Sequence, residues 1–346
     1  MISKISVRNY GRFGNDKHEV FFAPETIIVG ANNSGKSTFI SAINVIAQTL
    51  KRVGVQGPGT TISSQLNIQD EAKFGVLPNA AHNNKREGSM ELGIEGSDAS
   101  FNLRIDGPIY TQFSLTSNGK DIASIQQLAQ TIFNTRFLLS TRGFVPTQSY
   151  VATGQPPNIV TAYLERWTSR DDRWDLAETW LKKIDPTVRI LKTPLRGAVS
   201  SIEMSVGYPD GTTDINASLM GSGMQRAFEI IYEVIFSPPG STIIIEEPEM
   251  NLHPESQQLL VDLFNEGVNK FNKQIIVTTH SWDIILPFES DIGKGTPRGD
   301  AHEKADKSKF KLIRFLIENQ TPKIIEYDLR NNTFDQFKRD FKIMWG

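Results

Sequence analysis

The chain has 346 residues, enough for one large domain or two ordinary domains with a sizeable core. Hydrophobic residues make up 38% of the sequence and charged residues 22%, as in a soluble globular protein, and the formal net charge of −2 excludes the overall basic field of a dedicated nucleic-acid binder. The absence of cysteine excludes disulfides and thiol chemistry, and the lack of a signal-peptide pattern or an apolar run of about 18 residues predicts a cytoplasmic protein with no membrane partner.

The first 50 residues predict two or three strands, a loop and a helix. Apolar or alternating residues over 2–8 and 18–29 are typical of strands, with a turn at Pro24. The second run ends at Gly30, where a glycine-rich loop begins. Over 36–50 the apolar residues recur with helical spacing, so we expect a helix directly after the loop.

The middle of the chain predicts a β-rich region followed by helices. Residues 51–88 are rich in Gly, Ser, Asn and Pro and are expected to be irregular. Period-two alternation in MELGIEG, SFNLRID and YTQFSLTSNGK predicts an antiparallel meander, and helical spacing returns over 121–137. The elements expected next are a short strand at 137–140, one or two helices over 158–186 ending at Pro186, and strands around 187–192 and 201–208, with a turn at YPDGT.

The last third alternates helices and strands, which predicts a largely parallel α/β core. The expected order is a helix over 222–236, a strand over 241–247, a helix over 254–271 and a strand over 273–280. Residues 291–309 then predict an exposed mobile loop, and 310–329 a helix or strand followed by a closing edge strand.

The glycine-rich loop GANNSGKS, residues 30–37, fits the phosphate-binding pattern G-x-x-x-x-G-K-[ST] between a predicted strand and a predicted helix. Glycines let the backbone curl so that successive N–H groups face phosphates, and the helix N-terminus adds partial positive charge. Lys36 can reach the β- and γ-phosphates, and the Ser37 hydroxyl can ligate Mg²⁺. An ordinary glycine turn is the alternative. The pattern predicts ATP and Mg²⁺ as cofactors, bound by Gly30, Asn32, Asn33, Ser34, Gly35, Lys36, Ser37 and Thr38.

Three carboxylates crowd together after the strand IIIEEPE, at Glu246, Glu247 and Glu249. Like charges at this spacing are unfavourable unless a cation neutralises them. Ligands of parallel α/β sheets bind at the carboxyl ends of the strands, so we expect this strand to end beside the phosphate loop. Glu246 would then hold Mg²⁺ through water, and Glu247 would orient or deprotonate the attacking water. The alternative is a solvated acidic loop.

Two further stretches are candidates for phosphate contact. His280 ends the strand KQIIVTTH, one helix after the acidic strand, so we expect the two strands to be neighbours and His280 to hydrogen-bond the γ-phosphate. A structural histidine is the alternative. Ser222 and Gly223 start a helix with small residues and form a second anion site, which one chain does not need unless it meets the ATP of another copy.

Together GANNSGKS, GSGMQ, IIIEEPE and TTH, in this order and spacing, resemble an ABC-type ATPase head of the OLD (overcoming lysogenization defect), RecF- and SMC-like group. GSGMQ is similar to the signature LSGGQ, with Met224 where the second glycine stands. The resemblance implies a P-loop α/β fold with a mixed sheet core, an antiparallel β-rich subdomain and a helical signature lobe. We expect one bilobal domain over 1–346, with a core of 1–135 and 240–346 and a lobe of 136–239.

The resemblance also implies a head that forms a homodimer or higher homo-oligomer around ATP, with Ser222 and Gly223 contacting the γ-phosphate in trans. MNLHP occupies the D-loop position and has His253 where transporters have aspartate. The remaining candidates are Gln65 and Gln69 for the Q-loop, Arg8 and Asn9 near the nucleotide, and Arg142 as either a linker residue or a basic contact.

The stretch between the phosphate loop and the signature lacks a long coiled coil, and the tail after His280 lacks room for the nuclease domain that OLD proteins carry. We therefore expect an ATPase subunit whose ATP-dependent dimerisation regulates a separate effector, a nuclease or toxin of bacterial anti-phage defence. Two alternatives stay open. One is a RecF-like repair ATPase that binds DNA directly, with RNA as a further possible partner, and the other is a nucleotide-regulated scaffold that does not hydrolyse ATP.

Overall fold

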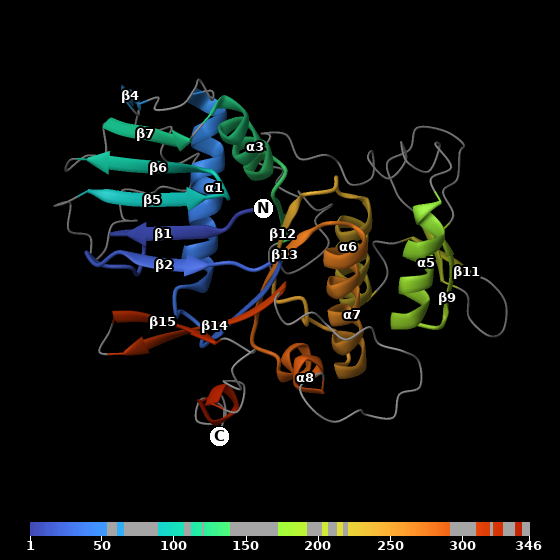
Figure 1. The fold of residues 1–346 in the computed structure, drawn as a ribbon. Helices are drawn as coiled ribbons and strands as arrows, with labels where there is room; N and C mark the ends of the chain where they lie inside the picture. Colours follow the sequence, from blue (N-terminus) through green and yellow to red (C-terminus); the bar gives the residue numbers. More distant parts are fainter. Residues whose placement is uncertain are drawn as a thin grey trace. The chain divides into compact units, whose positions relative to one another are not determined.

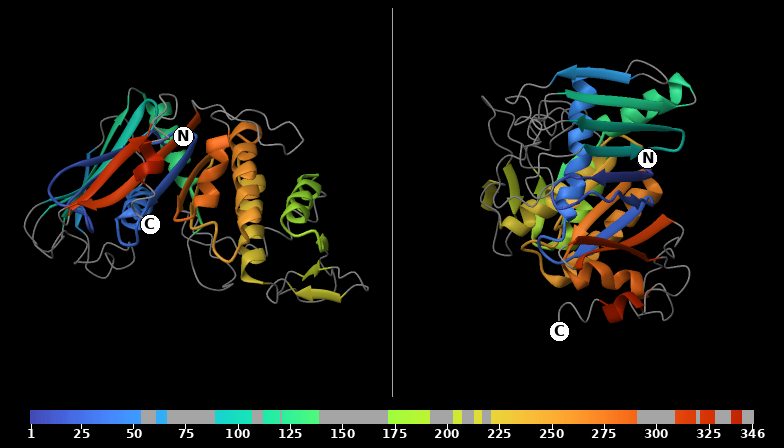
Figure 2. Two further views of the ribbon diagram at one scale, coloured as in Figure 1. Left: turned by 90° about the horizontal axis from the view of Figure 1, so that it is seen from below. Right: turned by 90° about the vertical axis from the view of Figure 1, so that its left-hand side faces the viewer.

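The structure is a computed structural model in which contacts divide the chain into two compact units (Figures 1 and 2). Unit 1 comprises Met1–Thr135 with Asp306–Gly346, and unit 2 comprises Arg136–Ala305. The residues that the structure describes are 1–53, 61–65, 89–106, 112–119, 121–138, 172–191, 203–206, 213–216, 221–290, 309–318, 321–327 and 336–340. No helix in these ranges combines the length and apolarity that a membrane crossing requires.

Unit 1 contains a six-stranded antiparallel sheet with the strand order β2-β1-β5-β6-β7-β4. Its strands are β1 (Lys4–Arg8), β2 (His18–Phe21), β4 (Thr61–Gln65), β5 (Met90–Glu95), β6 (Ala99–Asp106) and β7 (Gln112–Gly119). Helices α1 (Lys36–Val53) and α3 (Ile122–Phe133) pack on it, and buried apolar side chains such as Ile5, Leu92 and Phe101 form the core beneath them. The predicted meander is confirmed.

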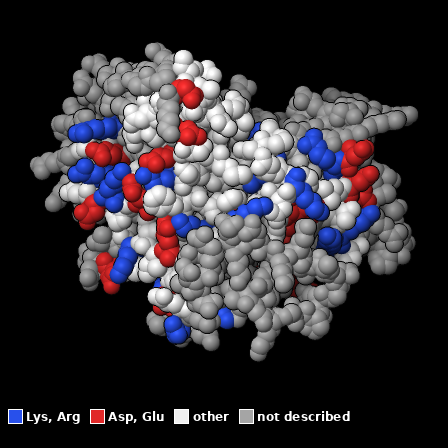
Figure 3. Space-filling model, in the orientation of Figure 1, with Lys and Arg blue, Asp and Glu red and all other residues white. Residues whose placement is uncertain are grey.

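The polar side chains of this sheet form cross-strand ion pairs. Lys4 lies 2.7 Å from Glu95, and both Arg8 and Arg104 pair with Glu91, at 3.5 and 3.7 Å. Figure 3 shows basic and acidic residues interspersed on the visible face. Opposite charges on neighbouring strands offset each other, so this sheet presents a mixed surface rather than a uniformly basic one.

A second group of strands in unit 1 leads into the phosphate loop. The buried strand β3 (Glu25–Gly30) runs parallel to β14 (Phe310–Glu318), which pairs antiparallel with β15 (Thr321–Tyr327). The ring of Phe13 packs edge-on against the rings of Phe39 and Phe315. This aromatic cluster fixes the start of α1 against β14.

Unit 2 is built on parallel strands in the order β13-β12-β8. These are β8 (Arg136–Leu138), β12 (Thr242–Glu246) and β13 (Gln274–Thr279), and every residue of β12 and β13 is buried. Fully buried strands of a parallel sheet are near-continuously apolar, as IIIE and QIIV are here. The helices of the unit are α5 (Arg173–Ile184), α6 (Ser222–Phe236), α7 (Pro254–Lys270) and α8 (Trp282–Ser290), and β9 (Val188–Leu191), β10 (Glu203–Val206) and β11 (Thr213–Asn216) form a small antiparallel sheet.

Three elements correct the sequence-based expectations. Strand β4 lies within the segment expected to be irregular, because its backbone pairs with β7 although its sequence TISSQ has little apolar character. Strand β11 pairs antiparallel with β10, and α8 begins at Trp282, two residues after His280. The predicted YPDGT turn lies outside the described residues. The open choice for 310–329 resolves as two strands. The predicted mobile loop lies outside the described residues over 291–308, as do Gln69 and Arg142; Gln65 ends β4.

Candidate functional site

The phosphate loop of unit 1 requires glycine at two positions, because the backbone has a positive φ there and leaves little room for a Cβ. Gly30 has φ 155°, and a Cβ there would lie 2.2 Å from the backbone oxygen of Phe315. Gly35 has φ 102°, and its Cβ would lie 3.2 Å from the ring of Phe13. Asn33 takes up the left-handed conformation between them, with φ 66°. The loop therefore curls tightly over its own strand and helix, the conformation that turns backbone N–H groups toward an anion.

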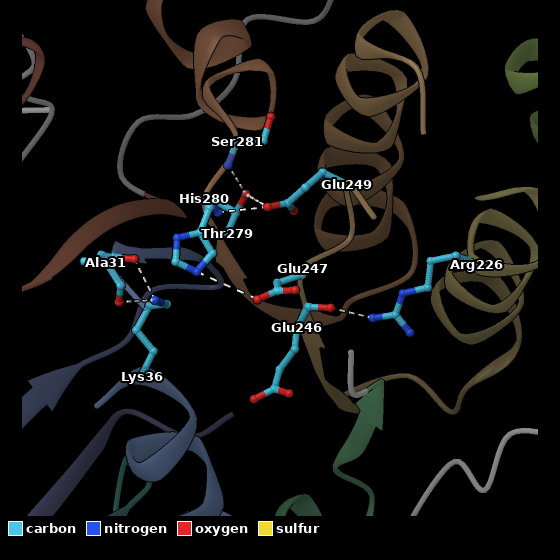
Figure 4. Close-up of polar contacts among 10 residues, drawn as sticks. Ala31, Lys36, Arg226, Glu246, Glu247, Glu249, Thr279, His280 and Ser281 are labelled. Carbon is cyan, nitrogen blue, oxygen red and sulfur yellow. Dashed lines mark hydrogen bonds and ion pairs between the residues drawn. The ribbon is translucent and has the colours of Figure 1, made fainter. Parts of the chain in front are cut away.

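Lys36 begins α1 and folds back over this loop. Its ammonium donates to the backbone oxygens of Gly30 at 2.6 Å and Ala31 at 3.0 Å, and the residue is only 7% exposed (Figure 4). The other predicted loop residues differ in exposure: Asn32 and Ser37 are exposed, Thr38 is half-buried and Ser34 is fully buried. The loop thus gathers a cation, a helix N-terminus and an accessible hydroxyl within eight residues of sequence.

The segment after β1 packs against the start of the same helix. A Cβ on Gly11, which has φ 57°, would lie 2.3 Å from the methyl group of Thr38, and the hydroxyl groups of Tyr10 and Ser41 are 2.8 Å apart. The sequence analysis predicted that Arg8 and Asn9, in this same segment, lie near the nucleotide. In the structure both side chains bond to backbone oxygens of unit 1. The Arg8 Nε donates to Asn15 O at 2.8 Å, and the Asn9 amide donates to Ser89 O at 3.4 Å. Their contact with a nucleotide stays a prediction.

In unit 2, the acidic strand and the histidine strand end side by side, as predicted. Glu246 lies opposite Thr278 in the parallel register of β12 and β13. The chain leaves β12 through Glu247, which has φ 47° and whose N–H donates to Thr278 O at 2.8 Å. The Glu247 Oε1 lies 3.7 Å from the His280 Nε2 (Figure 4). A carboxylate and an imidazole are therefore held within reach of one water molecule.

Glu249 is a member of this cluster to which the sequence gave no role. Its Oε1 accepts hydrogen bonds from the Thr279 hydroxyl and from the His280 N–H, both at 2.8 Å. Burial raises the pKa of the Glu249 carboxyl, against the lowering effect of those hydrogen bonds. Only its place next to Glu246 and Glu247 marks this residue in the sequence.

Arg226 of α6 is a second residue that the sequence did not reveal. Its Nη2 donates to Glu246 O at 2.6 Å and to Leu138 O at 3.0 Å, and its Nη1 pairs with Glu229 at 3.3 Å. The side chain is buried, and burial lowers its pKa while Glu229 acts in the opposite direction. One guanidinium thus joins the signature helix to the end of the acidic strand.

The predicted signature residues lie at the first turn of α6. Ser222 is exposed, whereas Gly223 is buried, and a Cβ at Gly223 would lie 2.1 Å from Asn251 O. Packing within unit 2 therefore requires glycine at 223, and contact of Ser222 and Gly223 with a phosphate stays a prediction. His253 has a structural role, because its Nδ1 accepts from the Glu255 N–H at 3.4 Å and caps α7.

Each unit, taken by itself, carries groups suited to binding phosphate or Mg²⁺. Unit 1 supplies a curled backbone, the Lys36 ammonium and the Ser37 hydroxyl, and unit 2 supplies the Glu246 and Glu247 carboxylates with His280. Hydroxyl and carboxylate oxygens are the ligands that Mg²⁺ prefers. Among the described residues, no three His, Asp or Glu side chains form a ready metal cluster, so a metal would take its remaining ligands from phosphate and water.

Comparison with known proteins gives a family and a set of relatives. The family model for the AAA ATPase domain matches residues 1–142 and 157–285. The OLD nuclease of Thermus scotoductus is 23% identical over an alignment of 318 residues that covers 81% of this chain and 59% of that protein. The energy-coupling factor transporter ATP-binding protein EcfA2 of Mycoplasma capricolum is 26% identical over an alignment of 117 residues that covers 31% of this chain and 39% of that protein. The chain thus spans less than two thirds of either relative.

Solved structures show the same fold. An Smc head bound to the C-winged helix domain of ScpA matches 95% of this chain and 98% of its own, with a TM-score of 0.60 and 17% identity. An Smc head with an extended coiled coil, bound to the C-terminal domain of ScpA from Pyrococcus furiosus, matches 98% of this chain and 99% of its own, with a TM-score of 0.57 and 14% identity. The predicted α/β fold with mixed sheets is confirmed.

Proposed function

The chain belongs to the AAA ATPase domain family, with the head architecture of OLD- and SMC-like proteins, and from this premise we propose that it binds ATP with Mg²⁺ and hydrolyses it. The observation that carries the proposal is the pair of Glu247 and His280, 3.7 Å apart at the carboxyl ends of two parallel strands. A binding module without turnover needs no base at such a position, whereas hydrolysis needs one that can orient or deprotonate a water.

Each residue has a separate role in this proposal. The phosphate loop and Lys36 bind the β- and γ-phosphates, and Ser37 and Glu246 hold Mg²⁺, with Glu246 acting through water. Glu247 orients the attacking water and accepts its proton, while His280 hydrogen-bonds the γ-phosphate. The buried Arg226 supports this set through the carbonyl of Glu246.

We also propose that two copies of the chain share the ATP. Ser222 is exposed at the start of α6, where an arginine would place bulk and charge against a facing γ-phosphate. Ser222→Arg should abolish hydrolysis and leave ATP binding through Lys36 nearly intact, because that contact lies within one chain. Isothermal titration and a phosphate-release assay on the same preparation separate the two effects.

Mixing two inactive variants tests the sharing directly. A Ser222→Arg chain and a Lys36→Ala chain can together build one site, with the intact loop of one and the intact signature of the other. Partial activity on mixing, at most about half of wild type per dimer, supports a shared site. Normal hydrolysis by Ser222→Arg alone at every protein concentration would contradict the dimer.

We propose, finally, that the ATP-bound dimer regulates a separate effector. The support is the likeness to the OLD nuclease of Thermus scotoductus, a protein whose name states nuclease activity. A nuclease or toxin encoded next to this chain should associate with it in native mass measurements, and the complex should change with ATP. Salt-dependent DNA binding by the head alone would instead favour a repair-type ATPase.

A further inference from the structure

The turn that follows the acidic strand, residues 247–252, is closed by hydrogen bonds within its own backbone. Met250 N–H donates to Glu247 O at 3.2 Å and Leu252 N–H to Glu249 O at 3.0 Å, so residues 247–252 form two successive tight turns. Glu247 and Asn251 have positive φ values of 47° and 59°. A conformation of this kind persists only where its surroundings hold it.

Glu249 is the side chain that ties these turns to the histidine segment. One oxygen, Oε1, accepts from both the Thr279 hydroxyl and the His280 backbone N–H. The Thr279 hydroxyl in turn accepts from the Ser281 N–H at 2.9 Å. The backbone of His280 is therefore held by a residue only two positions from Glu247.

A second bridge closes the same arrangement further along the turn. The Gln257 side chain of α7 donates to Leu252 O at 2.9 Å and accepts from the Ser281 hydroxyl at 2.5 Å. The Ser281 hydroxyl also accepts from the Asp283 N–H at the start of α8, at 3.1 Å. The two segments, 247–252 and 279–281, are thus joined at both ends, by Glu249 (Figure 4) and by Gln257.

We propose that Glu249 is a positioning residue for ATP hydrolysis: by holding Thr279 and His280 through one oxygen, it fixes the His280 imidazole against the Glu247 carboxylate. This inference rests on the proposed function, because it assigns Glu249 a part in that reaction. Glu249 touches neither nucleotide nor water in this role and acts through its neighbour.

The hydrogen-bond pattern says how Glu249 acts. Among the described residues, its Oε2 is buried and makes no hydrogen bond, while Oε1 carries both accepted bonds. A glutamine can place its carbonyl oxygen where Oε1 lies, so the accepting geometry survives without the charge. Substitution by glutamine should therefore abolish most ATP turnover at Glu247 and leave most of it intact at Glu249.

The test compares four variants of the full chain with wild type and with Glu247→Gln. Glu249→Ala and Thr279→Val remove the acceptor and the donor of one hydrogen bond, whereas Glu249→Gln and Thr279→Ser keep them. We expect the first two to lower kcat for ATP by about 10- to 100-fold with KM nearly unchanged, because misplacing a catalytic group costs turnover rather than phosphate binding. The conservative variants Glu249→Gln and Thr279→Ser should retain most of the turnover. Glu255→Ala, at an exposed glutamate, serves as the matched control.

Each other outcome overturns the inference. Wild-type kcat in both Glu249→Ala and Thr279→Val would show that the bonds are dispensable. Loss of turnover in Glu249→Gln equal to that in Glu247→Gln would make Glu249 a chemical group rather than a positioning one. If Glu249→Ala does not fold, Thr279→Val against Thr279→Ser decides alone. Absence of hydrolysis in wild type would instead refute the proposed function and this inference with it.

Discussion

The phosphate loop of unit 1, residues 30–37, and the acidic turn of unit 2, residues 246–252, are stabilised in different ways. The loop is shaped by its own backbone: glycine lies where a Cβ would strike Phe315 O or the Phe13 ring, and Lys36 bonds to carbonyls five and six residues away. The acidic turn is shaped by side chains from distant elements, Arg226 on α6 and Thr279 on β13, which bond to the chain around Glu246 and Glu249.

This difference explains why the two regions differ in what their sequences reveal. A backbone-shaped site needs glycines and a lysine at fixed spacing, and such spacing is visible in one short stretch. A turn supported by side chains depends on residues about 20 positions before and 30 after it, and no local pattern connects them. Substitutions in the acidic turn should therefore mainly lower stability, whereas substitutions in the phosphate loop should mainly lower ATP affinity.

The largest expected effect is on stability, in the region held by side chains. Arg226→Met removes the guanidinium that pairs with the buried Glu229 carboxylate and donates to the backbone oxygens of Leu138 and Glu246. We expect a loss of about 3 kcal/mol in the free energy of unfolding, as for other broken buried ion pairs, measured by urea or thermal unfolding. Lys182→Met, at an exposed ion pair of the same unit, should cost less than about 1 kcal/mol. Equal stability of the two variants would contradict the supporting role of Arg226.

The next effect is on nucleotide affinity, in the region shaped by backbone. Lys36→Ala leaves phosphate charge uncompensated and should weaken ATP binding by about 10- to 100-fold, within the range of charged hydrogen bonds, with little change in unfolding. Isothermal titration measures the affinity, and the exposed Lys17→Ala is the control. Unchanged ATP affinity would mean that GANNSGKS is not the phosphate loop.

The smallest expected effect is that of Asn33→Gly, which separates the role of the loop's backbone from that of one of its side chains. Asn33 has φ 66°, which asparagine and glycine both tolerate, so Asn33→Gly should change stability by less than about 1 kcal/mol and leave ATP affinity unchanged. A loss of ATP affinity in a titration would show that the Asn33 side chain, and not only its backbone, binds the nucleotide.

Much of the fold could be predicted because its elements have strong periodicity. The helices starting at Lys36, Ser222 and Pro254 begin where expected, and the buried strands IIIE and QIIVTT are confirmed. Strand β4 was missed because pairing with β7 defines it and Ile62 is the one apolar residue of its sequence TISSQ. For the candidate site, the pattern predicted the loop, the acids and His280, whose part in binding and hydrolysis stays a prediction. The contacts of Glu249 and Arg226 required the positions of their partners in space.

The proposed function depends most on Glu247 as the base for ATP hydrolysis. Phosphate release by Glu247→Gln, measured together with its ATP affinity, tests this role most directly. The substitution keeps the shape and removes the base, so ATP should bind as in wild type while hydrolysis falls by about 10²-fold or more, leaving the protein in an ATP-bound dimer. Intact turnover in Glu247→Gln would contradict the claim. If Glu246→Gln then abolishes turnover, the roles of the two glutamates are reversed.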